Sequence, residues 1–192
     1  MAEEEPRPLR VDAQRNREKI LAAATRLFSL ESLDTQMERI AKEAGVGSAT
    51  LYRNFPTHET LVEAVYRNEV AQLCDAAPRL LTTSPPLEAL RAWMQLFLDY
   101  LTTKYGLIDA LRAIADAGED LYGHSRDMIQ SALSTLMEAC AAEGTIRTGI
   151  RPTDVGAALE GIALTSASPE KREQAERLID LVLDGLSPVH DD

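Results

Sequence analysis

The sequence predicts an all-α protein with an N-terminal three-helix helix-turn-helix domain and a C-terminal helical domain. Apolar residues recur at intervals of three and four along the chain, and no stretch alternates between apolar and polar residues as a strand would. Glycine, proline and serine interrupt this pattern often enough to divide it into about nine helices. A chain of 192 residues, 45% hydrophobic and 27% charged, can bury a core and is ordinary for a soluble globular protein.

The formal net charge of −11 is unevenly distributed. Residues 1–58 hold nine Lys or Arg and nine Asp or Glu, whereas residues 59–192 hold 11 and 22. The net negative charge therefore lies in residues 59–192. It does not exclude an anionic partner for residues 1–58. No run approaches about 18 apolar residues and the N-terminus is polar, so we expect a cytoplasmic protein without a membrane span or signal peptide.

No motif indicates catalysis or cofactor binding. Neither Cys74 nor Cys140 has a second Cys or His at metal-ligand spacing, so we expect two small buried thiols, with a redox-sensing pair as the alternative. The chain has no H-E-x-x-H, phosphate loop or G-x-S-x-G, and no histidine follows a glutamate by three as in ferritin-like metal bundles. We expect no cofactor, no metal and no enzymatic activity.

The first two helices have clear apolar faces and ends. The second begins at a capping box, in which the Thr35 hydroxyl accepts from the Glu38 amide and Glu38 reaches back. Gly45 ends it, as glycine does where a positive φ is needed. The first helix buries residues spaced three and four apart, which are Ile20, Ala24, Leu27 and Phe28.

The third and fourth helices follow closely. The third runs from Gly47 or Ser48 to about Asn54, where Pro56 stops it. Thr57 can cap the fourth helix, which fades by Pro78. Five more helices are predicted after a serine-proline break at residues 84–86; they cover residues 87–104, 107–116, 121–142, 152–166 and 169–186.

Ala41, Gly45 and Leu51 have the spacing of a helix-turn-helix. The small residue allows close helix approach, the glycine makes the turn, and the leucine closes the pair, with Ile40 and Val46 completing this core. A helical hairpin that packs against another protein is the alternative. The residues left on or near the outer face are Ser48, Ala49, Thr50, Arg53 and Asn54.

These outward residues suit a helix that enters the major groove. Ser48 and Ala49 are small enough for close approach, and arginine, here Arg53, is the side chain best suited to guanine O6 and N7. The Tyr52 hydroxyl suits a phosphate, which positions a protein without reading sequence. His58 lies near a positive helix end, where an anion is favoured.

Residues from about Asn16 to Glu69 resemble the DNA-binding domain of TetR-family transcriptional regulators. The stretches that carry the resemblance are REKILAAATRLF and MERIAKEAGVGSATLYRNFPTHETLVEAV. It implies a homodimer on a roughly palindromic double-stranded DNA operator, with a recognition helix over about residues 47–54 and a C-terminal domain for an unknown small-molecule effector. The DNA-binding residues expected are Thr35, Gln36, Gly47, Ser48, Ala49, Thr50, Tyr52, Arg53, Asn54 and His58.

The chain departs from the family pattern at three positions. Many members have lysine at Ser48 and His58, which usually serves phosphates, and glycine at Ser32. Weaker non-specific affinity and a shallower salt dependence would follow. The N-terminal arm could compensate by reaching phosphate or the minor groove through Arg7, Arg10 and Arg15.

Three regions are expected along the chain. Residues 1–14 form a flexible N-terminal arm, and residues 15–58 form the helix-turn-helix domain. The family motif extends to about residue 75, so the fourth helix serves as a connector. Residues 59–192 bind the effector and dimerise, and they resemble the SbtR-like subgroup of C-terminal domains through LEALRAWMQLFLDYLTTKYGLIDALR and DLYGHSRDMIQSALSTLMEACAAEGTIR.

Two surfaces are expected in the back region. Large apolar residues and two tyrosines could line a ligand pocket between helices, with plain core as the alternative. They are Trp93, Phe97, Tyr100, Leu101, Leu111, Ile114, Tyr122, Met128 and Met137. The last two helices have apolar residues on more than one face, which favours a two-fold dimer contact over a monomer. That interface would include Val155, Leu159, Ile162, Leu178, Ile179, Val182 and Leu186.

The sequence therefore predicts a DNA-binding transcriptional regulator, with a ligand-responsive repressor as the leading interpretation. The sequence leaves two alternative functions open. One is a helical adaptor that binds protein, and the other is a constitutive regulator that binds DNA without a ligand.

Overall fold

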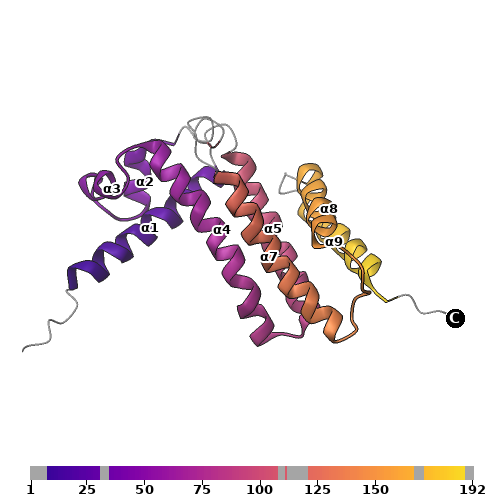
Figure 1. Ribbon diagram of the computed structural model, residues 1–192. Coiled ribbons are helices and arrows are strands. Elements are labelled where there is room, and N and C mark those ends of the chain that lie inside the picture. Colours follow the sequence, from indigo (N-terminus) through magenta and orange to yellow (C-terminus); the bar gives the residue numbers. More distant parts are fainter. Residues whose placement is uncertain (1–7, 31–34, 108–110, 112–120, 167–170, 189–192) are drawn as a thin grey trace, which may run out of the picture. The chain divides into compact units, whose positions relative to one another are not determined.

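The computed structural model describes residues 8–30, 35–107, 111, 121–166 and 171–188. Within these ranges it contains eight α-helices and no strand, which confirms the all-α prediction (Figure 1). Nine helices were expected; the ninth was predicted over residues 107–116, most of which lie outside the described ranges. No helix of the described part is both long and apolar enough to span a membrane.

The chain divides into two compact units, Met1–Asn68 with Gly106–Gly118, and Glu69–Tyr105 with Glu119–Asp192. The boundary falls inside α4 (His58–Thr83), later than the expected boundary after His58, because this helix continues without a break. The first helix also begins earlier than expected. Helix α1 spans Pro8–Leu30, so residues 8–14 are helical rather than part of an arm. Proline is well tolerated in a first helical turn, where its missing N–H has no partner to lose.

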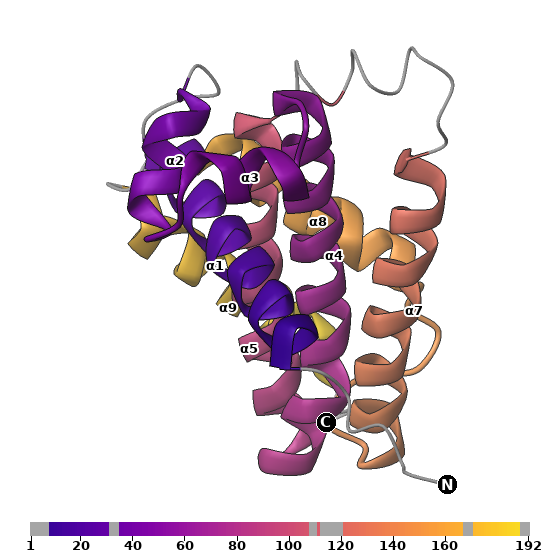
Figure 2. The ribbon, with the colours of Figure 1, turned by 90° about the vertical axis from the view of Figure 1, so that its left-hand side faces the viewer.

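The first unit is built on α1, which contacts both α2 (Met37–Glu43) and α3 (Ser48–Asn54), while α2 contacts α3 (Figure 2). The apolar faces predicted for these helices are confirmed by their burial. The core comprises Ile20, Ala24, Leu27, Phe28, Ile40, Ala41, Leu51, Phe55, Leu61 and Val65.

A glycine turn joins α2 to α3. Gly45 has φ +66°, a conformation that costs other residues about 1–2 kcal/mol. The amide of Val46 donates to the Ala41 carbonyl at 3.0 Å, and the amide of Gly45 donates to the Lys42 carbonyl at 3.1 Å. This pair of bonds is the Schellman ending, so the prediction that Gly45 closes the helix is confirmed.

Two helix caps were predicted, at Thr35 for α2 and at Thr57 for α4. Helix α2 begins at Met37 with Gln36 in the N-cap position, one residue later than a cap at Thr35 would place it, and the Gln36 side chain makes no capping bond. At α4 the Thr60 amide donates to the Thr57 hydroxyl and the Thr57 amide donates to the Thr60 hydroxyl, both at 3.2 Å. The Thr57 cap is therefore confirmed.

The second unit contains the end of α4, together with α5 (Pro86–Gly106), α7 (Leu121–Ala142), α8 (Pro152–Thr165) and α9 (Arg172–Leu186). Helix α4 continues through Pro78 to Thr83 instead of fading there. The turn before the proline is anchored in the core by Leu73, Ala76 and Ala77, and Leu80 and Leu81 after it are half-buried. Arg91 pairs with Asp180, and Arg172 pairs with Asp99 at 2.9 Å, so two ion pairs join α5 to α9.

Candidate nucleic-acid interface

One side of α3 is open to solvent. The buried side is fixed by Leu51, which is fully enclosed, as is Ile40 of α2. Side chains at a helical spacing of three and four share a face, so burying Leu51 turns the opposite arc outward. Ala49 and Arg53 lie opposite Leu51, and Ser48 and Tyr52 extend this outward arc along one flank; all four are exposed, as is Gly47 just before them.

Thr50 and Asn54 lie on the flank of α3 and are half-buried. The Asn54 side-chain amide donates to the Thr50 carbonyl at 2.8 Å, one turn earlier in the same helix. We expected both residues on or near the outer face. The structure instead places them on the flank of α3 opposite Ser48 and Tyr52, where Asn54 lines a groove together with Phe55 and residues of α1.

Arg53 is the unpaired cation of the outward arc. Within the described part of the chain it makes no ion pair and no hydrogen bond, and its side chain is exposed. Other arginines of this unit are engaged, since Arg26 pairs with Glu43 at 2.7 Å and Arg67 with Glu63 at 2.6 Å. The Arg53 guanidinium is thus free to bind an external acceptor.

Tyr52 is already engaged in the free protein. Its hydroxyl donates to a Glu38 carboxylate oxygen at 2.9 Å, across the turn between α2 and α3. The hydrogen bond to Glu38, followed by partial desolvation and the carboxylate charge, raises the pKa of the tyrosine. A phosphate that takes this hydroxyl must displace Glu38 as its acceptor, and the carboxylate repels the phosphate at close range.

Three more residues expected at the interface have different surroundings. Gln36 is exposed, as an interface residue should be, but Thr35 is buried at 8% exposure. The His58 ring packs edge-on against Phe28, with ring centres 5.5 Å apart. Its Nε2 is buried and has no hydrogen-bond partner in the described part of the chain. Packing against the core thus draws His58 and Thr35 away from the surface.

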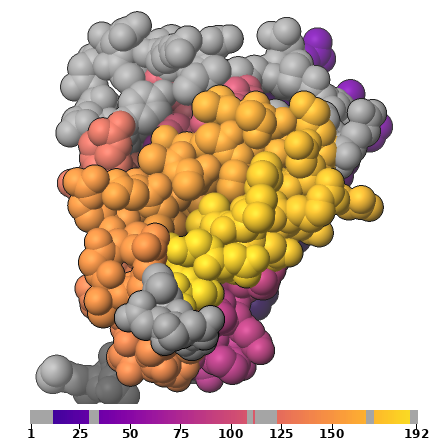
Figure 3. Space-filling model, turned by 90° about the vertical axis from the view of Figure 1, so that its right-hand side faces the viewer, coloured from indigo at the N-terminus to yellow at the C-terminus, as the bar shows by residue number. Residues whose placement is uncertain are grey.

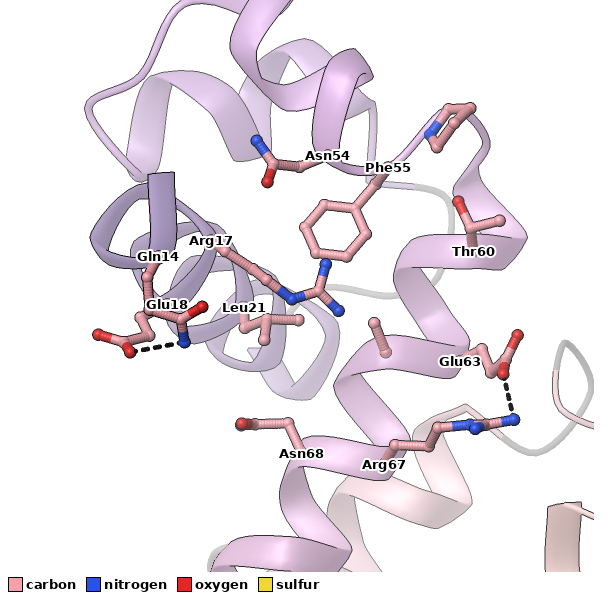
Figure 4. Close-up of a pocket in the computed structure, with 12 residues that line it drawn as sticks. Gln14, Arg17, Glu18, Leu21, Asn54, Phe55, Thr60, Glu63, Arg67 and Asn68 are labelled. Atoms are coloured by element: carbon pink, nitrogen blue, oxygen red, sulfur yellow. Dashed lines mark hydrogen bonds and ion pairs between the residues drawn. The ribbon is translucent and has the colours of Figure 1, made fainter. Parts of the chain in front are cut away.

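A groove of about 630 Å³ lies beside this interface, between α1, the end of α3 and the start of α4 (Figure 4). In it the Arg17 guanidinium stacks over the Phe55 ring, 4.6 Å from the ring centre. Phe55 is the residue that follows α3, so this contact helps to hold the end of α3. Sequence reasoning missed the role of Arg17, because residues so distant in sequence are paired only by the fold.

The residues expected to line a ligand pocket have different surroundings in the structure. Trp93 and Phe97 stack with ring centres 5.5 Å apart, and the Trp93 indole N–H donates to the Leu73 carbonyl at 2.9 Å. Leu111 is buried but belongs to the first unit. Ile114 and the side chain of Tyr122 lie outside what the structure describes. Also buried are Tyr100, Leu101 and Met137.

Met128 is the predicted ligand residue that lines an open space. It lies in a groove of about 500 Å³ between α4 and α7, and none of the other predicted ligand residues that the structure describes lines this groove. The aromatic cluster therefore fills the core of the second unit, while the groove is built mostly from small and polar residues that hydrophobicity does not single out.

Most of the residues expected in the dimer interface lie in the core of the chain itself. Leu178 and Val182 are half-buried, while the other five are buried: Val155, Leu159, Ile162, Ile179 and Leu186. These side chains face inward because α8 packs against both α7 and α9. The large apolar residues left open on these two helices are instead Leu164 and Leu181, each 65% exposed.

The two cysteines are free thiols, Cys140 buried as expected and Cys74 only half-buried. Burial, followed by the charge of Asp75, raises the pKa of Cys74 to about 11, and burial also raises the pKa of Cys140. Little thiolate forms at neutral pH, which disfavours a redox role. Within the described ranges no cluster of three His, Cys, Asp or Glu residues could hold a metal ion.

Comparison with known proteins gives the same family for both ends of the chain. Residues 20–65 match the family model of bacterial regulatory proteins of the tetR family, and residues 85–188 match that of the SbtR-like transcriptional regulator C-terminal domain. A TetR transcriptional regulator from Streptomyces coelicolor is 65% identical, with a TM-score of 0.86 over 91% of this chain and 99% of that one.

Two further likenesses agree. A TetR transcription regulatory protein from Mycobacterium vanbaalenii is 34% identical, with a TM-score of 0.78 over 94% of this chain and 100% of that one. Helix-turn-helix transcriptional regulators from Staphylococcus aureus are 40% identical over 63 residues, which are 32% of this chain and 34% of theirs. The match to these curated relatives thus spans about a third of their length.

The Tyr52–Glu38 contact predicts a gain of function. Glu38→Gln removes a negative charge next to the expected phosphate position, so affinity should rise about threefold for any duplex, the effect of one unit charge at about 6 Å in water. Binding to unrelated duplexes at low salt, measured by fluorescence anisotropy, checks this. Glu173→Gln, an equal charge change in the second unit, is the control. Equal behaviour of both variants would contradict the role of Glu38.

Proposed function

Because the chain belongs to the TetR family of transcriptional regulators, we propose that it acts as a homodimeric, ligand-responsive repressor on a palindromic operator in the cytoplasm. The observation that carries this proposal is the outward arc of α3. It combines small residues for close approach, an engaged hydroxyl and an unpaired guanidinium on one short, exposed helix.

Each residue of this arc has a distinct role in the proposed complex. Ser48 and Ala49 allow the helix to approach the floor of the major groove. Arg53 reads a guanine through O6 and N7, which makes it the specificity residue. Tyr52 exchanges Glu38 for a phosphate oxygen and fixes the position of the helix on the backbone. Thr50 and Asn54 keep the helix flank in place rather than contacting bases.

The dimer would use the outer faces of α8 and α9, which lie side by side on one surface (Figure 3). Both faces combine small residues with one exposed leucine. On α8 they are Ala157, Ala158, Gly161 and Leu164, and on α9 they are Leu178, Leu181 and Gly185. Small residues allow close helix contact, and a surface of this kind is covered most simply by the same surface of a second copy.

Such a dimer places two recognition helices on one side of a duplex, about one helical turn (~34 Å) apart or more. An effector bound in the second unit would shift α4, which contributes residues to both units, and so change the spacing of the recognition helices. Coupling of about 1–3 kcal/mol is typical of allosteric regulators and is enough to release an operator.

Substitutions in the outward arc should separate reading from positioning. Arg53→Ala should lose about 1–3 kcal/mol of discrimination between the operator and a mismatched site, because one bidentate base contact is gone. Tyr52→Phe should weaken binding to every sequence by about 0.5–1.5 kcal/mol, the net value of one hydrogen bond. Titration of matched and mismatched duplexes measures both effects. Unchanged binding in both variants would show that α3 is not the recognition helix.

Leu181→Glu should dissociate the dimer. It introduces a charge into the proposed interface at a cost of at least about 2 kcal/mol, which raises the dimer dissociation constant about thirtyfold. Analytical ultracentrifugation over a concentration series measures this constant. Lys42→Glu, a charge reversal at an exposed position of α2 in the first unit, should leave it unchanged. A dimer that tolerates Leu181→Glu would place the interface elsewhere.

A further inference from the structure

The groove between α4 and α7 has a regular wall on each side. Cys74, Ala77 and Pro78 line it from α4, at a spacing of three and four residues. Residues from four successive turns of α7 line the other side; they are His124, Asp127, Met128, Ser131, Ala132 and Thr135. The volume of about 500 Å³ is within the range of sites that hold small organic molecules.

A hydrogen-bond acceptor is left over in the α4 wall. Pro78 stands inside the helix and has no N–H, so the Cys74 carbonyl, four residues earlier, has no helical donor. The neighbouring Leu73 carbonyl is already engaged by the Trp93 indole N–H at 2.9 Å. A proline within a helix therefore leaves one backbone acceptor without its helical donor at a residue that lines this groove.

A carboxylate faces this wall from α7. Asp127 lines the groove and has no hydrogen bond or ion pair with any described residue of the chain. His124 also lines the groove, one turn before Asp127, but no lysine or arginine does. Burial first, and then the charge of Asp75, raise the pKa of the Cys74 thiol, so a second carboxylate acts on this wall. An anionic ligand is thus disfavoured, and a cation is favoured.

The geometry points to an organic cation as the ligand of this groove: an amine whose N–H groups donate to the Asp127 carboxylate and the Cys74 carbonyl. The apolar body of the amine lies on Ala77, Met128 and Ala132, of which the two alanines are buried and present only methyl groups. This inference rests on the proposed ligand-responsive function, since it names the chemical class of the effector and the position of its charged end.

The test uses three probes with one apolar body: octylamine, octanol and octanoate. Binding to the full-length protein is followed by fluorescence of Trp93, the one tryptophan of the sequence, whose indole N–H is bonded next to Cys74. We expect octylamine to bind about fivefold more tightly than octanol, the effect of one partly exposed ion pair, and octanoate to bind least. Equal affinity for amine and alcohol, tighter binding of octanoate, or no binding by any probe would overturn the inference.

Variants of the α7 wall locate the site. Asp127→Asn should reduce octylamine affinity to that of octanol and leave octanol unchanged, whereas Asp184→Asn on α9 should change neither. Ser131→Phe, at an exposed position that the fold tolerates, should fill the groove and abolish binding of octylamine and octanol. Unchanged octylamine binding in Asp127→Asn or in Ser131→Phe, with folding verified by circular dichroism, would overturn the site.

Operator release is measured separately by adding octylamine to the protein–DNA complex. Binding of the amine at this groove without any change in operator affinity would uphold the site and contradict the ligand-responsive part of the proposed function. Release of the operator by octylamine in the wild type, lost in Asp127→Asn, would uphold both.

Discussion

The burial of Leu51 is the constraint on which the rest of the first unit depends. Leu51 is fully enclosed, and it belongs to a helix of only seven residues. Such a short helix is not stable alone, so its rotation is set by the packing of this one side chain. The glycine turn at Gly45 brings α3 to the place where that packing occurs. Once Leu51 points inward, Tyr52 and Arg53 have to point outward.

In the free protein, two side chains of the proposed DNA-contacting face differ in whether they already have a hydrogen-bond partner. Arg53 has no partner to give up, whereas Tyr52 has to exchange the Glu38 carboxylate for a phosphate. Arg53 can therefore contact a base without breaking an existing interaction. Tyr52 can contact a phosphate only by giving up its hydrogen bond to Glu38, whose negative charge then lies near the phosphate. The family-typical lysines are absent at Ser48 and His58, and the His58 ring is drawn against Phe28. In the proposed complex, these features would weaken attraction to DNA in general and leave more of the affinity to sequence-specific contacts.

The first unit could be predicted from sequence because its signals are local. A glycine at Gly45 and a threonine at Thr57 each specify a backbone geometry within four residues, and both predictions were confirmed. The faces of α8 and α9 could not be predicted in this way. Helix α8 has apolar residues all round, so periodicity does not say which face is buried and which is exposed. Helix α9 has one charged face, but Leu181 lies at its edge and is exposed. Ile162 and Leu164 are two residues apart, and only the fold decides that the first is buried and the second exposed.

Long-range pairings explain the other differences. Arg17 over Phe55, and Trp93 against the Leu73 carbonyl, each join residues far apart in sequence, and no local pattern marks them. The groove beside Pro78 was also missed. Local sequence predicts that the helix ends near this proline, whereas Pro78 lies inside α4. Tertiary burial overrides the local preference there and leaves a carbonyl free in the wall of a groove.

The most direct test of the central claim, that α3 of a dimer reads DNA, is selection of binding sites by the purified protein from a random duplex library at physiological salt. The account predicts one enriched palindrome, with half-sites about one helical turn apart or more and a guanine in each half-site that Arg53→Ala no longer selects. A protein that is dimeric in solution, free of bound ligand and yet enriches no sequence would contradict it.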